Sequence, residues 1–256
     1  MNFPDPDKLF ASSAKMKLNF LIAFSLISYW FLTDFSWGGL VLGFVSYATI
    51  GKIGGDVAMH RYFSHRSFQT NWFWDKVLKF TSFMIGHGSM FLWAITHRAH
   101  HKDSDTVQDP HPPNIAGFRS IFLRTWSSGF TPSAKFGKDL MRDSDIMFIH
   151  KYYFKLFYLW LIILFMLGYN VVLFLFAFPC FGFFLETGIV NTVCHRYGYR
   201  TYETSDQSTN NILVNTLTLG NGMHNTHHAH QGLYTTDLGK WYEFDLMKLF
   251  INAIRT

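Results

Sequence analysis

The sequence of 256 residues is long enough for one domain or two small ones, and it is 49% hydrophobic but only 15% charged. A typical soluble domain carries about 25% charged residues, so this composition, with 29 phenylalanines, is that of a membrane protein. The net charge of +5 reflects a shortage of acids, and no basic run forms a patch for nucleic acid. Cys180 and Cys194 form neither a CxxC motif nor a disulfide framework, so we expect a protein facing the reducing cytoplasm.

Four apolar segments approach the roughly 20 residues that a membrane-spanning helix needs. They cover residues 18–35, 38–59, 152–167 and 170–193. Very short connections join the first two and the last two, so we predict two helical hairpins. Residues 72–95 are interrupted by two lysines and a histidine, and we predict an amphipathic helix at the membrane interface there.

The distribution of basic residues predicts the orientation. Residues 1–17 contain three Lys, residues 60–151 contain twelve Lys and Arg, and residues 195–256 contain five. Neither hairpin tip contains a basic residue, so both termini are expected on the cytoplasmic side. All 13 histidines lie in the same segments. The sequence therefore predicts one domain over residues 1–256: an all-α integral membrane protein whose cytoplasmic helical cap, residues 60–151 and 195–256, carries the chemistry.

Two copies of an HxxHH pattern stand out, "HRAHH" at residues 97–101 and "HNTHH" at residues 224–228. Residues three and four apart are neighbours on a helix, so each copy projects three imidazoles into one small volume. A lone histidine is more often a core or surface residue than a ligand, but two such copies among 13 histidines are improbable by chance. Neutral imidazole is a good ligand for iron, zinc and copper.

Further candidate ligands stand at the cytoplasmic ends of the second and fourth segments. His60 and His65 are five residues apart and do not share an α-helical face, so we expect the helix to end near residues 61–63. Asn191 and His195 are spaced i, i+4 and share one face. Nine histidines and one amide are more ligands than one metal ion can bind, but they are enough for two ions. None of the three glutamates begins an ExxH motif, which favours a nearly all-nitrogen two-metal site over a carboxylate-bridged one.

Four motifs, "HRYFSHRSF", "HRAHHKDSDTVQDPH", "NTVCHRYGYR" and "HNTHH", together resemble those of the membrane fatty acid desaturases. The resemblance is closest to the acyl-CoA (stearoyl-CoA type) branch and its bacterial relatives, and it covers roughly residues 38–250. It implies four membrane helices under a cytoplasmic cap that holds two irons. By motif, Asn191 would act through a water, and the iron ligands would be His60, His65, His97, His100, His101, His195, His224, His227 and His228.

The same resemblance implies an O2-dependent enzyme that introduces a cis double bond into a saturated acyl chain, carried by CoA, another carrier or a lipid. Two electrons must come from a separate ferredoxin, rubredoxin or cytochrome b5 type donor with its reductase, because the sequence has no HPGG segment and no cysteine cluster. Imidazole sites also take zinc, so we expect overexpressed protein to carry zinc in place of iron. Basic residues that could meet the donor or substrate phosphates, or that simply follow the positive-inside rule, are Arg119, Arg124, Lys135, Lys138 and Arg142.

Other positions also match the family. Trp93 and Thr187 match positions that line the acyl tunnel. Alternatively, Trp93 serves as an interfacial anchor and Thr187 supplies a hydroxyl for helix packing. Asp105 and Asp109 are candidates to orient metal-bound imidazoles, although capping and turn formation explain them equally well. The last motif reads "GNGMH" where the family has GEGxH, so Asn221 replaces an acid and is expected to weaken one such contact.

Lys52 is unusual because it lies within the second apolar segment. In the family this helix closes the far end of the acyl tunnel. The positions that face this end are found by counting back from the first motif histidine, and in this sequence they are Lys52 and Ala48. One hypothesis is that the Lys52 stem shortens the tunnel and limits the length of the accepted chain. The other is that Lys52 faces away and extends to the membrane surface, with Asp56 as an i, i+4 partner.

Two alternative functions stay open. The same histidine pattern would serve a hydroxylase, a ketolase or an enzyme that forms a terminal alkene or alkyne. A metal transporter or store is a more distant alternative, because its ligands should lie near the bilayer midplane rather than at the helix ends. Four further histidines do not match ligand positions and are interpreted as surface, tunnel or supporting residues: His87, His111, His150 and His230.

Overall fold

The computed structural model describes residues 12–110 and 133–256, and within these ranges the chain is helical, with isolated β-bridges and no extended strand. His111, Arg119 and Arg124, for which the sequence suggested roles, lie outside the described residues. Four helices are long and apolar enough to cross a membrane, and their spans are Lys15–Thr33, Trp37–Ser64, Ser144–Leu167 and Tyr169–Val193. These spans agree with the four predicted segments, and they make the chain a membrane protein.

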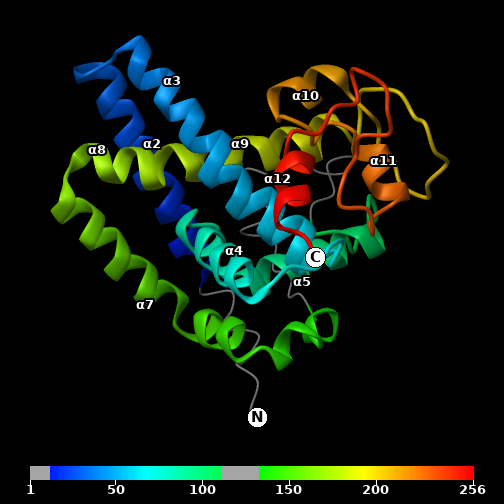
Figure 1. Ribbon diagram of the computed structural model, residues 1–256, viewed down its shortest axis with the longest axis horizontal. Coiled ribbons are helices and arrows are strands. Elements are labelled where there is room, and N and C mark those ends of the chain that lie inside the picture. The colour runs from blue at the N-terminus through cyan, green and yellow to red at the C-terminus, as the bar shows by residue number, and fades with distance from the viewer. Residues whose placement is uncertain (1–11, 111–132) are drawn as a thin grey trace.

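Short connections join the first span to the second and the third span to the fourth, whereas α4 and α5 lie in the long segment between the second and third spans (Figure 1). The first span is α2 (Ser12–Thr33), and the second runs from α3 (Trp37–Ser46) directly into the π-helix η1 (Tyr47–Ser64). The third is α7 (Ser144–Leu167), and the fourth comprises α8 (Tyr169–Val172), η5 (Leu173–Ala177) and α9 (Phe178–Val193). Leu32 and Met166 are each 82% exposed, as expected of side chains that face lipid in place of water.

A π-helix replaces the helix end that the sequence predicts near residues 61–63, so that prediction is wrong. η1 continues through Ser64, and the His65 amide donates to the His60 carbonyl at 3.1 Å, which is an i→i+5 hydrogen bond. The wider turn brings residues five apart onto one face, so the rings of His60 and His65 lie 4.9 Å apart between centroids. Both imidazoles therefore face the same site without a break in the helix.

The predicted single helix over residues 72–95 is two helices, α4 (Trp72–Met84) and α5 (Met90–Asp103). The chain between them turns through Gly86 and Gly88, whose φ angles of 75° and 83° are accessible to glycine at little cost. The Asn19 amide donates to the Gly86 carbonyl at 2.7 Å and ties this turn to α2. The Ser89 hydroxyl then caps α5 by accepting from the Leu92 amide at 3.2 Å.

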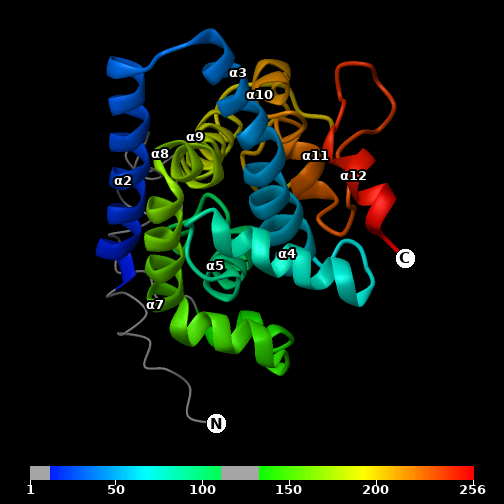
Figure 2. The ribbon, with the colours of Figure 1, turned by 60° about the vertical axis from the view of Figure 1, so that its left-hand side comes forward.

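The remaining elements are short: η3 (Ala134–Gly137), η4 (Leu140–Arg142), α10 (Ile212–Leu217), α11 (His224–Ala229) and α12 (Met247–Ile254). Figure 2 shows α2 and α7 on one side of the α3–η1 rod and α11 and α12 on the other. One apolar core joins η1, α5, α9 and α12, because Val57, Ile95, Phe183 and Ile251 are all buried in the same cluster. This core fixes the ends of η1 and α9 against α5 and the C-terminal segment.

Candidate metal centre

Nine histidines converge in two adjacent groups, and these are the nine that the motifs single out. Within each group the nitrogens that could bind a metal all lie within 4.8 Å of one another. The first group contains His60, His65, His97, His101 and His227. The second group contains His100, His195, His224 and His228.

Each HxxHH motif divides between the two groups, whereas the sequence suggested that its three imidazoles point into one volume. In α5 the i, i+4 pair His97 and His101 joins the first group, and His100 joins the second. In α11 the pair His224 and His228 joins the second group, and His227 joins the first. The two helices therefore bridge both groups, which holds the groups side by side.

The spacing of the nitrogens fits bound metal ions. In the first group, Nε2 of His227 lies 3.0 Å from Nε2 of His60 and 3.1 Å from Nε2 of His101. In the second, Nε2 of His224 lies 3.0 Å from Nε2 of His195 and 3.1 Å from Nε2 of His228. Two nitrogens at about 2.1 Å from one ion and at right angles to each other are about 3.0 Å apart. Nitrogens without protons would otherwise repel at this distance.

Carboxylates fix the orientation of four of these rings. In each case a carboxylate oxygen lies 2.7–3.2 Å from Nδ1, in the pairs His60–Asp56, His100–Asp109, His195–Asp105 and His228–Asp206. A carboxylate accepts a hydrogen bond from the Nδ1–H group, which keeps the proton on Nδ1 and leaves the lone pair on Nε2 free for a metal. The structure places the predicted Asp105 and Asp109 in these contacts.

Sequence reasoning missed the other two carboxylates. Asp56 stands four residues before His60 on the same helix, and that spacing could have indicated the pair. Asp206 lies in the loop before α10, 22 residues from His228, and no local pattern connects the two.

Burial keeps several of these imidazoles neutral. In the first group, burial lowers the pKa of His65, His101 and His227 well below the ordinary value. In the second group it lowers the pKa of His228 to about 4, although hydrogen bonding to Asp206 acts in the opposite direction. Neutral imidazole is the form that binds transition metals, so protons do not compete for these nitrogens at neutral pH.

A cavity opens beside the first group. The rings of Trp93 and Phe183 and the side chain of Val190 give it an apolar wall. Trp93 also stacks on His97, with ring centroids 4.8 Å apart. Asn191 and Thr187 line the same cavity, and the Thr187 hydroxyl donates to the carbonyls of the preceding helical turn.

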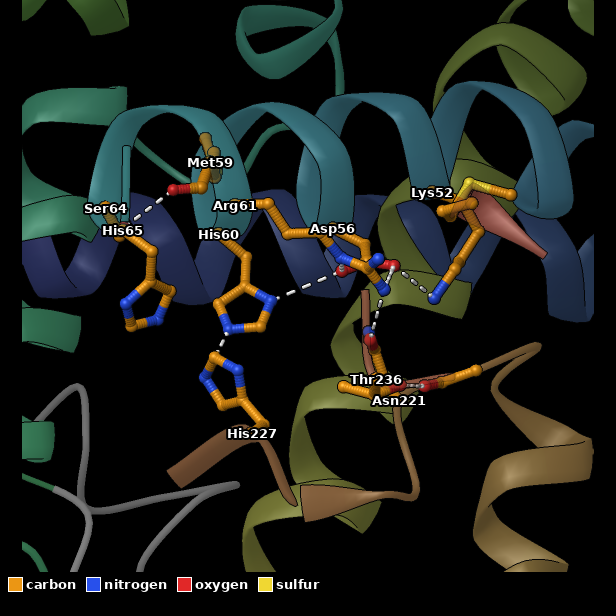
Figure 3. A network of polar contacts seen from close by, with 12 residues as sticks. Lys52, Asp56, Met59, His60, Arg61, Ser64, His65, Asn221, His227 and Thr236 are labelled. Atoms are coloured by element: carbon orange, nitrogen blue, oxygen red, sulfur yellow. Dashed lines mark hydrogen bonds and ion pairs between the residues drawn. The ribbon is translucent and has the colours of Figure 1, made fainter. Parts of the chain in front are cut away.

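Lys52 neither reaches the membrane surface nor lines this cavity, and the residue is fully buried. Its ammonium lies 2.9 Å from the Asp56 carboxylate and 2.6 Å from that of Glu186. Figure 3 shows Lys52, Asp56 and His60 projecting from the same face of η1. Of the three charged side chains Lys52, Asp56 and Glu186, Glu186 is the one that lines the cavity. Ala48 also lies outside the cavity lining.

Asn221 was expected to lie beside an imidazole, but in the structure its side chain contacts other groups. Its side-chain oxygen accepts from Arg61 at 3.1 Å, and its side-chain amide donates to Glu186. Arg61 in turn donates to Asp56 and to Asp245, so Asn221 belongs to the ionic network below η1 (Figure 3). It also lines the cavity, beside Glu186.

The other described histidines lie outside both groups. Nε2 of His87 is 2.9 Å from the Cys180 carbonyl, and the ring is buried among helices. Nδ1 of His150 is 2.7 Å from the Ser89 hydroxyl. His230 is exposed beside Tyr202.

Two adjacent histidine groups at the ends of membrane-spanning helices, next to a cavity with an apolar wall, define a membrane-bound enzyme with a candidate two-metal centre. The family model for fatty acid desaturases matches residues 35–249. The chain belongs to the fatty acid desaturase family, and it is an oxidoreductase acting on fatty acyl chains. This confirms the resemblance that the four histidine motifs indicate.

Several characterised proteins are similar to the chain. An sn-1 stearoyl-lipid 9-desaturase of Anabaena variabilis is 34% identical over 229 residues, which cover 87% of this chain and 83% of that protein. An acyl-CoA 5-desaturase of Anemone leveillei is 33% identical over 218 residues, covering 82% and 67% respectively. A hex-5-enoyl-[acyl-carrier protein] acetylenase of Moorena producens is 29% identical over 230 residues, covering 81% and 70%.

Proposed function

We propose that the chain introduces a cis double bond into a saturated fatty acyl chain in an O2-dependent reaction at a di-iron centre. The observation that carries the proposal is the pair of histidine groups beside the cavity with its apolar wall. For each double bond, two hydrogens leave adjacent methylenes, one O2 is consumed with two electrons and two protons, and two waters form. Unactivated C–H bonds offer no handle for acid–base chemistry, so the bound iron would supply the oxidation.

The protein residues would hold the metals and the substrate in place. The nine imidazoles would bind two irons, and Asn191, which lines the cavity, would act through a water. The carboxylates at Nδ1 would keep each lone pair directed at its metal. Trp93, Phe183 and Val190 would hold the acyl chain beside the first group and exclude water from it.

The setting in the membrane follows from the charge distribution. With four spans and the basic segments 1–17, 60–151 and 195–256, both termini and the metal centre would lie on the cytoplasmic side. The two pairs of spans would form hairpins, and residues 1–256 would act as one desaturase domain. A separate carrier of ferredoxin, rubredoxin or cytochrome b5 type, kept reduced by its reductase, would supply electrons from the cytoplasm.

Expression in a desaturase-deficient host, followed by fatty-acid profiling, tests the proposal. We expect new cis-unsaturated acyl chains with the wild-type protein. His227→Ala should lose them and His230→Ala should keep them, because only His227 belongs to a ligand group. Unchanged fatty acids with well-expressed wild-type protein and a supplied donor would contradict the proposal.

A second candidate, formation of a terminal alkyne, is favoured by one observation. The relative from Moorena producens is named an acetylenase and covers most of this chain. Gas chromatography of the products separates the two functions, because an internal cis alkene and a terminal alkyne give different mass spectra.

A further inference from the structure

A second opening also reaches the first histidine group, and His65 is the one residue that lines both this opening and the substrate cavity. It is lined by Ser64, His65, Arg98, His101, Lys102, Gln231 and Gly232. Of the nine candidate ligands, six are buried, and His60, His65 and His101 are partly exposed. His60 lines the substrate cavity and not this opening. His65 and His101 are therefore the ligand rings that face this second opening.

The opening is basic. Its lining includes Arg98 and Lys102 but no carboxylate. The ammonium groups of Lys102 and Lys135 both lie over the Phe136 ring, at 6.0 and 5.2 Å from its centroid. Arg98 donates to the Phe136 carbonyl at 2.6 Å, which places the aromatic ring and both lysines at the edge of the opening.

Acids at this edge are already paired. Asp139 accepts two hydrogen bonds from Arg98, at 2.7 and 2.9 Å, and a third from Arg66 at 2.8 Å. Desolvation opposes ionisation of this carboxyl, but the two guanidinium groups outweigh it and lower its pKa to about 2. Asp103 lies 3.7 Å from Lys102. We call Arg66, Arg98, Lys102 and Lys135 the basic rim. Their four positive charges outnumber the two negative charges of Asp103 and Asp139, which leaves an excess of two positive charges.

An acyl chain does not fit this entrance. The centroids of the His65 and His101 rings are only 4.6 Å apart. A methylene needs about 4 Å to each ring it touches, so a chain could not pass between the two rings. The polar lining also lacks the apolar surface that would bind a hydrocarbon. The opening therefore suits a partner that remains outside and exchanges no atoms with the site.

We infer that the basic rim is the docking surface of the electron donor, and that the donor is a small acidic one-electron carrier. The inference rests on the proposed function. The carrier would give one electron at a time through the edge of His65 or His101, becoming oxidised as the metal centre is reduced. Two such transfers would complete each double bond. Acidic charges on the carrier would face the rim, and this attraction would raise the association rate at low salt.

The test uses the full-length protein in detergent with a plant-type ferredoxin, ferredoxin reductase and NADPH as the acidic probe. One variant combines Lys102→Gln with Lys135→Gln. The matched control combines Lys240→Gln with Lys248→Gln, which removes the same charge elsewhere in the cap. Each protein is also reduced with dithionite and allowed a single turnover. Comparing ferredoxin-driven with dithionite-driven product formation separates docking from chemistry.

The rim variant should raise the KM for ferredoxin about tenfold at low salt and flatten its dependence on ionic strength, while the control stays within about twofold. Equal effects of the two double variants would overturn the inference. A raised KM for the acyl substrate with an unchanged KM for ferredoxin would also overturn it, since the rim would then bind the acyl carrier. Failure of the wild type to form product with dithionite would instead contradict the proposed function.

Discussion

The ammonium of Lys52 lies 2.6 Å from the carboxylate of Glu186, and the two side chains are 0% and 2% exposed within membrane-spanning segments. The same ammonium lies 2.9 Å from Asp56, whose carboxylate contacts the candidate ligand His60. A buried charge is costly unless it is paired, so the lysine holds both acids in place. One buried side chain thus connects the wall of the substrate cavity with a candidate metal ligand.

Replacing Lys52 with Met should destabilise the protein by about 3–5 kcal/mol, because Glu186 would lose its only described ion-pair partner in the core. Adding Glu186→Gln should recover part of the loss, since the second change removes the unpaired charge. Thermal unfolding in detergent measures both. Lys155→Met, which alters an exposed lysine of another spanning helix, serves as the control and should change little. Strictly additive effects of the two changes would show that the pair is not coupled.

The ionic network should also limit the length of the substrate. Glu186 stands on the cavity wall and Lys52 stands directly behind it, so charged groups would stop an acyl chain in this direction. Combining Lys52→Met with Glu186→Leu should shift the product profile toward longer chains. Ala48→Tyr should change little, because Ala48 lies outside the cavity lining. Feeding acids of several lengths provides the measurement, and an unchanged profile at normal protein levels would rule this role out.

The two histidine groups should be equally necessary. His227→Ala removes a nitrogen from the first group and His100→Ala removes one from the second. Each variant should insert into the membrane yet form no unsaturated product. His150→Ala and His230→Ala should keep substantial activity, because neither ring belongs to a group. An inactive His230→Ala beside an active His227→Ala would show that the ligands are assigned wrongly.

Purified active protein should contain two iron ions per chain. Overexpressed protein that carries zinc should be inactive, because zinc also binds imidazole but has no redox chemistry. Elemental analysis alongside the activity assay tests both expectations. One metal or none in fully active protein would contradict the two-metal centre.

The carboxylates at Nδ1 should matter for metal binding. Asp206→Asn keeps the size of the side chain but removes the charge that accepts from His228, and it should weaken metal binding about 10–100-fold. Competition with a chelator measures that affinity without reference to activity. Asp237→Asn alters an acid that pairs with Lys248 in the C-terminal segment, and as the control it should leave metal affinity unchanged. Equal affinities of the two variants would remove the role assigned to Asp206.

The sequence alone predicted the four spans, because a spanning helix must be apolar over about 20 residues and that property is local. It also indicated the nine histidines that gather in the structure: the i, i+3, i+4 spacing singled out six of them, and the motifs at the ends of the second and fourth spans added His60, His65 and His195. Local patterns failed where the backbone departs from the α-helix. The π-helical turn from His60 to His65 and the glycine turn at Gly86 depend on packing against other helices, and neither leaves a clear periodic signal.

Tertiary structure decided how the chemistry is arranged. The sequence could not divide His97, His100 and His101 between two groups, because the division depends on which rings of other helices approach each side of α5. It could not pair Asp206 with His228, or Lys52 with Glu186, which is 134 residues away. These contacts join charges from separate elements, and no spacing along the chain specifies them. Motifs and helical spacing in the sequence indicated the candidate ligands, whereas packing of distant segments determined what each candidate ligand and each charge faces.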